Sequence, residues 1–273
     1  MGRRIEWIGW AALLGFTFIF ALPLIFLLSS SLKLPSKIFI QPPEWIPNPI
    51  TLENYYQATK VIPFFLYMKN TIIISVLATI GTVLSCITPA HALAKMSFRG
   101  RRLLFSILLA TMFLPYPVVM IPTYLIFAKL HWTGTFLPLI VPSFMGDAFS
   151  IFLLRQFFIR LPTELLDAAR VDGANELQIL GLVVMPLSKA VLATVAVLQF
   201  TFMWSDFLRP LLYLNDTHQY TISIGLQNYQ AYHTTSWHLV LAGTVIFITP
   251  IFLIFWVAQR TFVSGLTLGS LKE

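Results

Sequence analysis

The charged residues with the clearest potential for chemistry lie in one short stretch, Leu161 to Pro186. Charged residues make up only 11% of this 273-residue chain, yet this stretch contains Glu164, Asp167, Arg170, Asp172 and Glu176. Unpaired charges are costly in hydrocarbon, so we expect the stretch to lie outside a lipid bilayer although apolar runs flank it. Mixed charges on a short amphipathic segment suit docking into a groove on a soluble partner.

No pattern for catalysis or nucleotide binding accompanies these charges. The sequence lacks the G-x-x-x-x-G-K-[ST] phosphate loop, the G-x-S-x-G elbow and the H-E-x-x-H zinc motif. The histidines have no spacing typical of metal ligands, and packing or interfacial positions account for them: His91, His131, His218, His233 and His238. We expect no enzyme activity, metal site or cofactor in this chain, and an energy source on another subunit.

The charged stretch is predicted to form a helix, a turn and a second helix. Thr163 is expected to cap the first helix, and Gly173 to end it in a left-handed conformation. A second helix can start in 174–182, with its end or a bend at Pro186. The apolar side of the first helix is formed by Leu165, Leu166, Ala168 and Ala169.

The composition of the whole chain predicts an all-α integral membrane protein. The sequence is 57% hydrophobic and 15% aromatic, with a mean hydropathy of +0.79, whereas soluble domains are about a quarter charged. The net charge of +7 fits basic residues that flank membrane spans better than nucleic-acid binding. We predict one transmembrane domain over residues 1–273, with spans at about 8–28, 71–94, 103–127, 136–158, 187–207 and 239–258.

Three of the predicted segments have further expected features. The first span is too long for the apolar part of a signal peptide, so we expect an uncleaved helix. The third span contains three prolines, which predict a kinked or interrupted helix: Pro115, Pro117 and Pro122. The segment 29–70 is expected to be an ordered external loop with a helix near Leu52 to Lys60, capped by Thr51; a flexible linker is equally compatible with its first half.

Basic residues predict the orientation of the chain. The short loop from Lys95 to Arg102 holds four of them and should be cytoplasmic. Six spans place both termini on that same side, as well as the loop 161–186. Twelve of the 18 Lys and Arg residues then lie inside: Arg3, Arg4, Lys95, Arg99, Arg101, Arg102, Arg155, Arg160, Arg170, Lys189, Arg260 and Lys272.

The charged stretch resembles the EAA loop of importer-type ABC transporter permeases. The family pattern is Glu-Ala-Ala, three residues, Gly, nine residues, Ile, one residue, Leu-Pro. The matching positions are Asp167-Ala168-Ala169, Gly173, Val183 and Met185-Pro186. Asp, Val and Met replace the family's Glu, Ile and Leu, so charge and apolar character are kept. The alternative is an ordinary interhelical loop.

Other segments resemble the carbohydrate-uptake group of these permeases, which includes the shorter permease of the maltose system. The run Trp204 to Leu211 is similar to its W-N-D-F-x-x-P-L segment, and Gln259 to Lys272 is similar to its Q-R-x-F-V-x-G-L-T-x-G-A-V-K ending. Leu52 to Tyr55 is similar to the L-x-N-Y of its first external loop. The resemblance therefore covers the chain from about Leu52 to its end.

The resemblance implies a heterodimer with a second homologous permease in a bacterial or archaeal cytoplasmic membrane. It also implies two cytoplasmic ATPase subunits that hold ATP and Mg, and an extracytoplasmic solute-binding protein. The loop would be the coupling helix that docks into the ATPase, through Glu164, Leu165, Leu166, Asp167, Ala168, Ala169, Arg170 and Gly173. For each apolar residue, packing beneath the membrane domain is the alternative.

Two further sets of residues are candidates for function. Polar or aromatic residues in the spans could line a substrate pathway, although helix packing explains them as well: Gln199, Thr201, Trp204 and Asp147. Asp147 could also bind a cation or proton, or face a donor on a partner subunit. The resemblance further implies that the tail touches the ATPase, unless it is a frayed terminus, through Gly265, Leu266, Thr267 and Gly269.

The predicted function is that of a sugar or oligosaccharide permease driven by a separate ATPase. A permease for another solute, such as a glycerol phosphate, is the main alternative. An ion-coupled carrier would need its own energy coupling and usually an internal repeat around broken helices. A membrane scaffold without transport activity would need none of the prolines in the third span.

Overall fold

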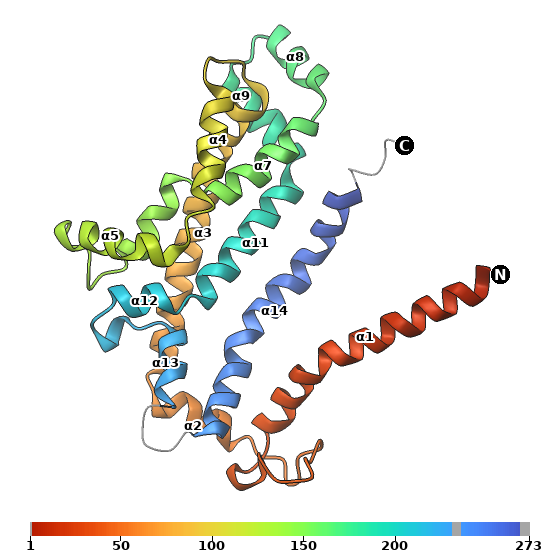
Figure 1. Ribbon diagram of the computed structural model, residues 1–273, viewed down its shortest axis with the longest axis vertical. Helices are drawn as coiled ribbons and strands as arrows, with labels where there is room; N and C mark the ends of the chain where they lie inside the picture. Colours follow the sequence, from red (N-terminus) through yellow and green to blue (C-terminus); the bar gives the residue numbers. More distant parts are fainter. Residues whose placement is uncertain (1, 231–235, 268–273) are drawn as a thin grey trace. The chain divides into compact units, whose positions relative to one another are not determined.

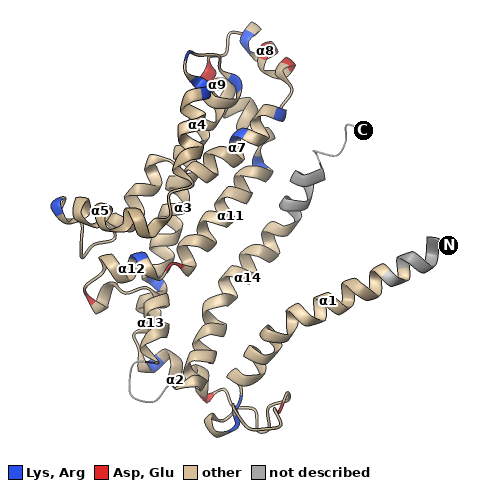
Figure 2. Ribbon diagram, viewed as in Figure 1, with Lys and Arg blue, Asp and Glu red and all other residues tan. Residues whose placement is uncertain are grey.

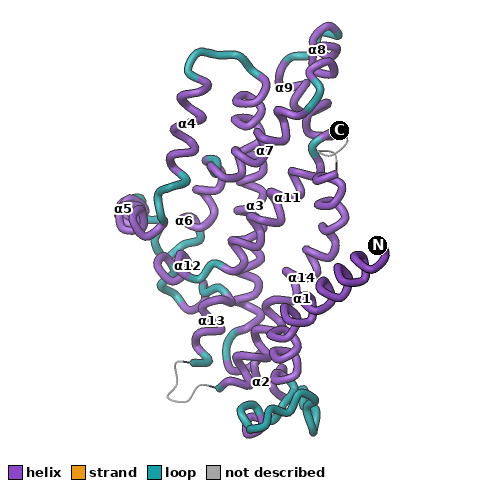
Figure 3. Tube along the Cα trace, turned by 45° about the vertical axis from the view of Figure 1, so that its right-hand side comes forward, coloured by secondary structure: helices purple, strands orange, loops and turns teal. Residues whose placement is uncertain are grey.

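The computed structural model describes residues 2–230 and 236–267, and gives only the helical backbone for residues 2–6, 8 and 260–267. Within these ranges the regular elements are all helices (Figure 3). This confirms the predicted all-α fold. The chain divides into two compact units, Met1–Phe65 with Ile224–Pro250, and Leu66–Ser223 with Ile251–Glu273.

The described part of the chain accounts for the predicted spans. Four segments are long and apolar enough to cross a membrane, in α1 (Gly2–Ser31), in α3 (Phe64–Lys95), over Leu137–Arg160 and in α14 (Trp237–Thr267). Two bent helix pairs bring the total to six if each pair counts as one span. A proline lies near each bend, Pro115 directly before α5 and Pro186 within α10.

The first bent pair lies in the third predicted span, where an interruption was expected. Helix α4 (Arg101–Thr111) and helix α5 (Tyr116–Lys129) meet at 97° across a short break (Figure 1). Pro115 occupies the N-cap of α5, and its fixed φ and missing N–H prevent α4 from continuing. The expectation of an interrupted helix is confirmed.

The fourth predicted span, 136–158, is broken as well, which the sequence analysis did not anticipate. It consists of α6 (Leu137–Ile140), the 3-10 turn η2 (Val141–Met145) and α7 (Ala148–Arg160). Gly146 separates the last two with a φ of 91°, a conformation that favours glycine. Helix α3 holds this break: the Ser85 hydroxyl donates to the Ser143 carbonyl at 3.0 Å.

The fifth predicted span, 187–207, begins two residues later than expected. Helix α9 (Glu176–Ile179), the π-helical turn η3 (Leu180–Val184) and α10 (Met185–Leu187) run up to Ser188, where the chain bends by 82° into α11 (Lys189–Ser205). The bend expected at Pro186 is therefore present, displaced to Ser188. A π-helical turn carries one more residue than an α-turn, so it changes which side chains face inward.

One apolar core joins the helices of the second unit. Its buried side chains come from α3, α7, α9 with η3, α11 and the short helix α8 (Thr163–Val171), and include Ile87, Leu154, Phe158, Leu166, Ile179, Val184 and Val195. A smaller core at α12 (Leu208–Tyr213) contains Ile74, Leu139, Tyr213 and Leu214. The 3-10 turn η4 (Thr217–Gln219) follows α12, and Asn70 Nδ2 on α3 donates to the carbonyls of His218 and Tyr220 at 2.9 and 3.0 Å.

In the first unit, the predicted external loop is organised around helix α2 (Glu53–Val61), after the short turn η1 (Pro35–Lys37). Asn54 Nδ2 donates to the carbonyls of Ser31 and Lys33, both at 2.8 Å, and the hydroxyls of Tyr55 and Ser31 lie 2.6 Å apart. The Asn and Tyr of the L-x-N-Y motif thus fasten α2 to the end of α1. The Thr51 hydroxyl accepts from the Glu53 N–H at 3.2 Å, as a cap would, although Leu52 holds the N-cap position. Helix α13 (Ile222–Asn228) follows η4 along the chain.

A charged hairpin as candidate coupling site

The charged stretch folds into a hairpin of α8 and α9 at one end of the group formed by α3, α4, α7 and α11 (Figure 1). Acidic and basic residues gather at this end of the ribbon (Figure 2). Helix α8 begins at Thr163, with Pro162 in the N-cap position and no side-chain cap bond. The prediction that Thr163 caps the helix is wrong, because the extended conformation of Pro162 already makes Thr163 the first helical residue.

The turn between the two helices follows the prediction at Gly173. This residue has a φ of 85°, and its N–H donates to the Arg170 carbonyl at 3.0 Å, which closes the end of α8. The start of α9 has a feature that the sequence analysis missed. Asn175 and Gln178 form a reciprocal capping box, in which each side chain accepts from the backbone N–H of the other, at 2.9 and 2.8 Å.

The apolar side chains of α8 divide between two faces. Leu166 is only 1% exposed and lies in the apolar core, with Ala169 packed partly against that core. Leu165 is 47% exposed and Ala168 is also exposed. Leu166 and Ala169 therefore pack on their own bundle, which is the alternative given for each apolar residue, and their part in ATPase docking stays a prediction. Val171, which was not predicted as a contact, is 88% exposed.

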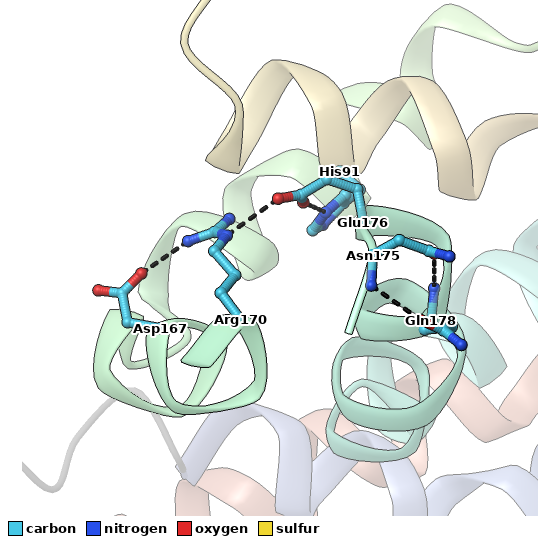
Figure 4. Close-up of polar contacts among 6 residues, drawn as sticks. All are labelled: His91, Asp167, Arg170, Asn175, Glu176 and Gln178. Carbon is cyan, nitrogen blue, oxygen red and sulfur yellow. Dashed lines mark hydrogen bonds and ion pairs between the residues drawn. The ribbon is translucent and has the colours of Figure 1, made fainter. Parts of the chain in front are cut away.

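The charged side chains of the hairpin form a continuous series of polar contacts (Figure 4). Arg170 Nη1 donates to Asp167 Oδ1 at 2.6 Å, and Arg170 Nε donates to Glu176 Oε1 at 2.9 Å. The other oxygen of Glu176, Oε2, lies 3.3 Å from Nε2 of His91. His91 belongs to α3, so the series joins both helices of the hairpin to the second predicted span.

The contacts shift the acid–base equilibria of the loop. The hydrogen bond from Arg170 lowers the pKa of the Glu176 carboxyl below its ordinary value, and the contact with His91 adds to the shift while burial opposes it. The same hydrogen bond, together with the one to Asp167, raises the pKa of Arg170. Both shifts favour the charged pair, so the bridge forms between ionised groups.

Two other basic residues connect the helix ends near the hairpin. Lys95 Nζ, at the end of α3, donates to the carbonyls of Leu161 and Ile159 at 2.6 and 3.3 Å, which are free because α7 ends there. Arg155 Nε on α7 donates to the Leu93 carbonyl at 3.1 Å. Lys95 was expected to report orientation; in the structure it also fixes the point at which the chain enters α8.

Comparison with known proteins identifies the class to which this arrangement belongs. Residues 81–262 match the family described as the binding-protein-dependent transport system inner membrane component. The chain belongs to this family. It is the permease subunit of an ABC importer and therefore a transport protein. It resides in an inner membrane.

Individual relatives agree with this assignment. The permease is 31% identical over 271 residues to the arabinooligosaccharides transport system permease protein AraQ of Halalkalibacterium halodurans, with 97% of each chain covered. It is 33% identical over 237 residues to the sn-glycerol-3-phosphate transport system permease protein UgpE of Shigella flexneri, with 84% of each covered. Its structure matches, with a TM-score of 0.82 and 27% identity over 95% of this chain and 97% of the other, a chain of a bacterial ABC transporter involved in the import of the acidic polysaccharide alginate.

Three of the four predicted pathway residues of the permease lie on α11, and Asp147 occupies the N-cap of α7. Trp204 is buried and its ring stacks on Phe200, with centroids 5.3 Å apart, so its face is not available to a sugar. The Thr201 hydroxyl donates to the Val197 carbonyl of its own helix at 2.8 Å, and Gln199 is half-buried on α11. Asp147 Oδ2 caps α7 by accepting from the Ser150 N–H at 2.8 Å. In this chain Asp147 caps a helix and Trp204 packs against Phe200, and a pathway role for the four residues stays a prediction.

The motif that resembles W-N-D-F-x-x-P-L contains a charged pair that the sequence analysis did not assign. Asp206 Oδ1 accepts from the Arg209 N–H at 3.3 Å at the start of α12, and its Oδ2 lies 3.7 Å from Arg209 Nε. The Arg209 guanidinium also lies over the ring of Phe202, 4.7 Å from its centroid. Only the spacing of three residues between the two charges could have indicated this local pairing.

The predicted tail contact lies partly outside the described residues. Gly265, Leu266 and Thr267 form the last residues of helix α14, so the tail starts as a continuation of the sixth predicted span. Gly269 lies outside the described residues. The role of all four in ATPase contact stays a prediction.

Proposed function

We propose that this permease receives the movement of a cytoplasmic ATPase through the exposed face of α8. The observation that supports this most directly is the division of α8 into an anchored and a free side. Leu166 holds the helix on its own bundle, whereas Leu165, Ala168 and Val171 remain exposed beside the acidic residues Glu164 and Asp167. A short helix with a free apolar edge and flanking charges fits a groove on a soluble protein.

The complete transporter then has a heterodimer of this chain with a second homologous permease. Two ATPase subunits bind ATP and Mg and supply the energy, and an extracytoplasmic protein delivers the solute. Closure of the ATPases moves α8, and the permease pair changes access from one side of the membrane to the other. Lipid surrounds the remaining apolar helix faces, and nucleic acid has no part in this function.

The proposed substrate is a sugar or an oligosaccharide. The relatives named for arabinooligosaccharide and alginate transport support this class, and the resemblance of Trp204 to Leu211 and of the C-terminal segment points the same way. A second candidate is a glycerol phosphate, because the relative named UgpE matches over a similar share of the chain. An ion-coupled carrier is no longer a candidate, since the family depends on binding proteins.

The orientation proposed for the permease places both termini and the α8–α9 hairpin in the cytoplasm. The four basic residues between Lys95 and Arg102 support it through the positive-inside rule, and Arg160 and Arg170 lie in or next to the hairpin on the same side. This places the hairpin in the compartment that contains ATP.

The proposal is tested by coexpression of this permease with its second permease and its ATPase. We expect the ATPase to copurify with the intact chain and to be lost when Glu164 to Gly173 is deleted. Vesicles that contain the full complex should take up solute only with ATP and binding protein. The substrate class is then read from stimulation of ATP hydrolysis across a panel of oligosaccharides and glycerol phosphates. Uptake by the permease without any ATPase would contradict the proposal.

A further inference from the structure

We propose that His91 and Glu176 are positioning residues that transmit the movement of α8 to helix α3. The inference rests on the proposed coupling function and adds a specific route for it. Glu176 stands at the start of α9, directly after the turn, and contacts α8 through one oxygen and α3 through the other. A shift of α8 must therefore move α3 or break one of these contacts.

Glu176 is suited to this role because a carboxylate can accept two donors at once. Arg170 Nε approaches Oε1 at 2.9 Å, and His91 Nε2 approaches Oε2 at 3.3 Å. Hydrogen bonds to ionised groups are stronger and more directional than neutral ones. The capping box of Asn175 fixes the backbone on which Glu176 stands, so the carboxylate has a defined position.

His91 is held firmly in the body of α3. Its side chain is 3% exposed, and its ring meets the ring of Phe158 on α7 edge-on, with centroids 6.5 Å apart. Since a carboxylate only accepts, Nε2 of His91 is the donor in the contact with Glu176. Among the described residues, Nδ1 has no hydrogen-bond partner. The hydrogen bond that the imidazole makes here is therefore the one to Glu176 in the hairpin.

The apolar contacts around this bridge cannot fix a direction of movement by themselves. Leu166 and Ile179 hold the hairpin in the same core as Ile87 and Ala90 of α3. Hydrophobic burial is non-directional, so such contacts hold the hairpin on the bundle without favouring one direction of displacement. The hydrogen bond between Glu176 and His91 is directional and forms only over a narrow range of distances, so it resists displacement of the hairpin relative to α3. We infer that the core seats the hairpin and that the bridge makes its displacement effective on α3.

The experiment measures ATP hydrolysed per solute transported by the full reconstituted complex. His91→Leu removes the donor, and His91→Gln restores a donor near the same position, because the amide nitrogen of Gln can occupy the place of Nε2. Glu176→Gln provides a second test on a partly exposed residue, because an amide has one acceptor oxygen for two donors. The matched control is Ile87→Ala, one turn away on α3, which leaves a cavity in the same core without touching the bridge.

We expect His91→Leu and Glu176→Gln to keep their ATPase bound and to raise the ATP consumed per solute by roughly tenfold, the factor that corresponds to loss of one hydrogen bond to a charged group. His91→Gln should stay within about twofold of the unchanged complex by the same reasoning. Ile87→Ala should lower thermal stability but leave the ratio unchanged.

Three results would overturn the inference. The first is an unchanged ratio in both His91→Leu and Glu176→Gln. The second is a rise in Ile87→Ala equal to that in His91→Leu, which would show that loosening of the core alone uncouples transport. The third is no rescue by His91→Gln. Failure of the proposed function looks different, because then no ATPase copurifies even with the unchanged permease.

Discussion

Gly173 is the residue on which the shape of the hairpin depends most directly. Its φ of 85° is a conformation that costs other L-residues about 1–2 kcal/mol, although nothing lies within 4 Å of an added Cβ. We predict that Gly173→Ala loosens the turn between α8 and α9 and lowers transport per ATP several-fold. The measurement is solute uptake and ATP hydrolysis in the same vesicles.

Gly173→Asn is the matched control for this prediction. Asn tolerates the left-handed conformation better than Ala does, although its side chain is larger. It should retain most of the coupling. If Asn and Ala are equally harmful, then space at the ATPase interface, and not backbone strain, determines the effect.

Glu176 leads to a prediction about pH. Its pKa is lower in the folded hairpin than in an unfolded chain, so its bridge stabilises the hairpin fully above the unfolded pKa of about 4.3 and is lost as pH falls through the lower folded value. Arg170 and His91 are the groups that face it. A nitroxide label at Val171→Cys should become more mobile only as pH falls below the ordinary carboxyl value of about 4.3 and through the lower folded pKa of Glu176.

Glu176→Gln separates this effect from the titration of other groups. The variant should start with higher label mobility at neutral pH and change less on acidification. An equal acid response with and without Glu176 would assign the response to the other carboxylates of the hairpin.

At the scale of residues, the sequence predicted chemistry that depends on local spacing. Gly173 was correctly placed in the turn, and the charges were correctly assigned to one loop. The contact between His91 and Glu176 spans 85 positions, so no local pattern could reveal it. Trp204 has the chemistry of a sugar-stacking residue, but only tertiary structure shows that its ring is buried.

Helix α8 illustrates how one amphipathic element serves two neighbours. Leu165 and Leu166 are adjacent in sequence, but only the second lies in the core. We predict that Leu166→Ala costs about 2–5 kcal/mol of local stability, as large-to-small changes in cores do, and releases α8 from the bundle. Leu165→Ala should leave the stability of the permease unchanged and weaken its binding to the ATPase. Thermal unfolding and copurification, measured on both variants, distinguish the two roles.

The same pair of variants can contradict the division of faces. If Leu165→Ala destabilises the isolated permease as much as Leu166→Ala does, then the Leu165 face of α8 also packs against the permease itself and is not a free docking surface. If Leu166→Ala weakens ATPase binding without any loss of stability, then the residue is a direct contact.

The broken spans were predictable only where proline is concentrated. Three prolines predicted the break between α4 and α5. The break before α7 lies at Gly146 and depends on contacts from α3. The π-helical turn at Leu180 to Val184 has no signature in the sequence. Apolar content therefore gives the number of spans, while their interruptions arise from neighbours that the sequence does not identify.

For the whole molecule, the orientation across the membrane is the property that a single labelling experiment can test. Cys86 is the only cysteine and is fully buried, so the unchanged permease should react little with a membrane-impermeant maleimide. Val171→Cys should react in inside-out vesicles, because Val171 is highly exposed on α8. Asn215→Cys, between α12 and η4, should react in right-side-out vesicles.

Labelling of Val171→Cys from the outer side would reverse the proposed orientation and remove the hairpin from the compartment that contains ATP.

The prediction of orientation used charge alone. The all-helical fold followed from composition, because a chain this apolar must satisfy its backbone within helices when it crosses lipid. The arrangement of the helices did not follow, since apolar faces of similar composition can pair in many ways.

The anchored and free faces of α8 also restrict how this segment can change over evolution. One added or deleted residue between Thr163 and Leu166 would rotate the rest of the helix by about 100°. Leu166 would leave the core. After a deletion the charged Asp167 would take its place, and after an insertion Leu165 or the added residue would do so. Substitutions that keep the character of each face are therefore tolerable, but insertions and deletions before Leu166 are not, and this part of the loop should keep a constant length in functional descendants.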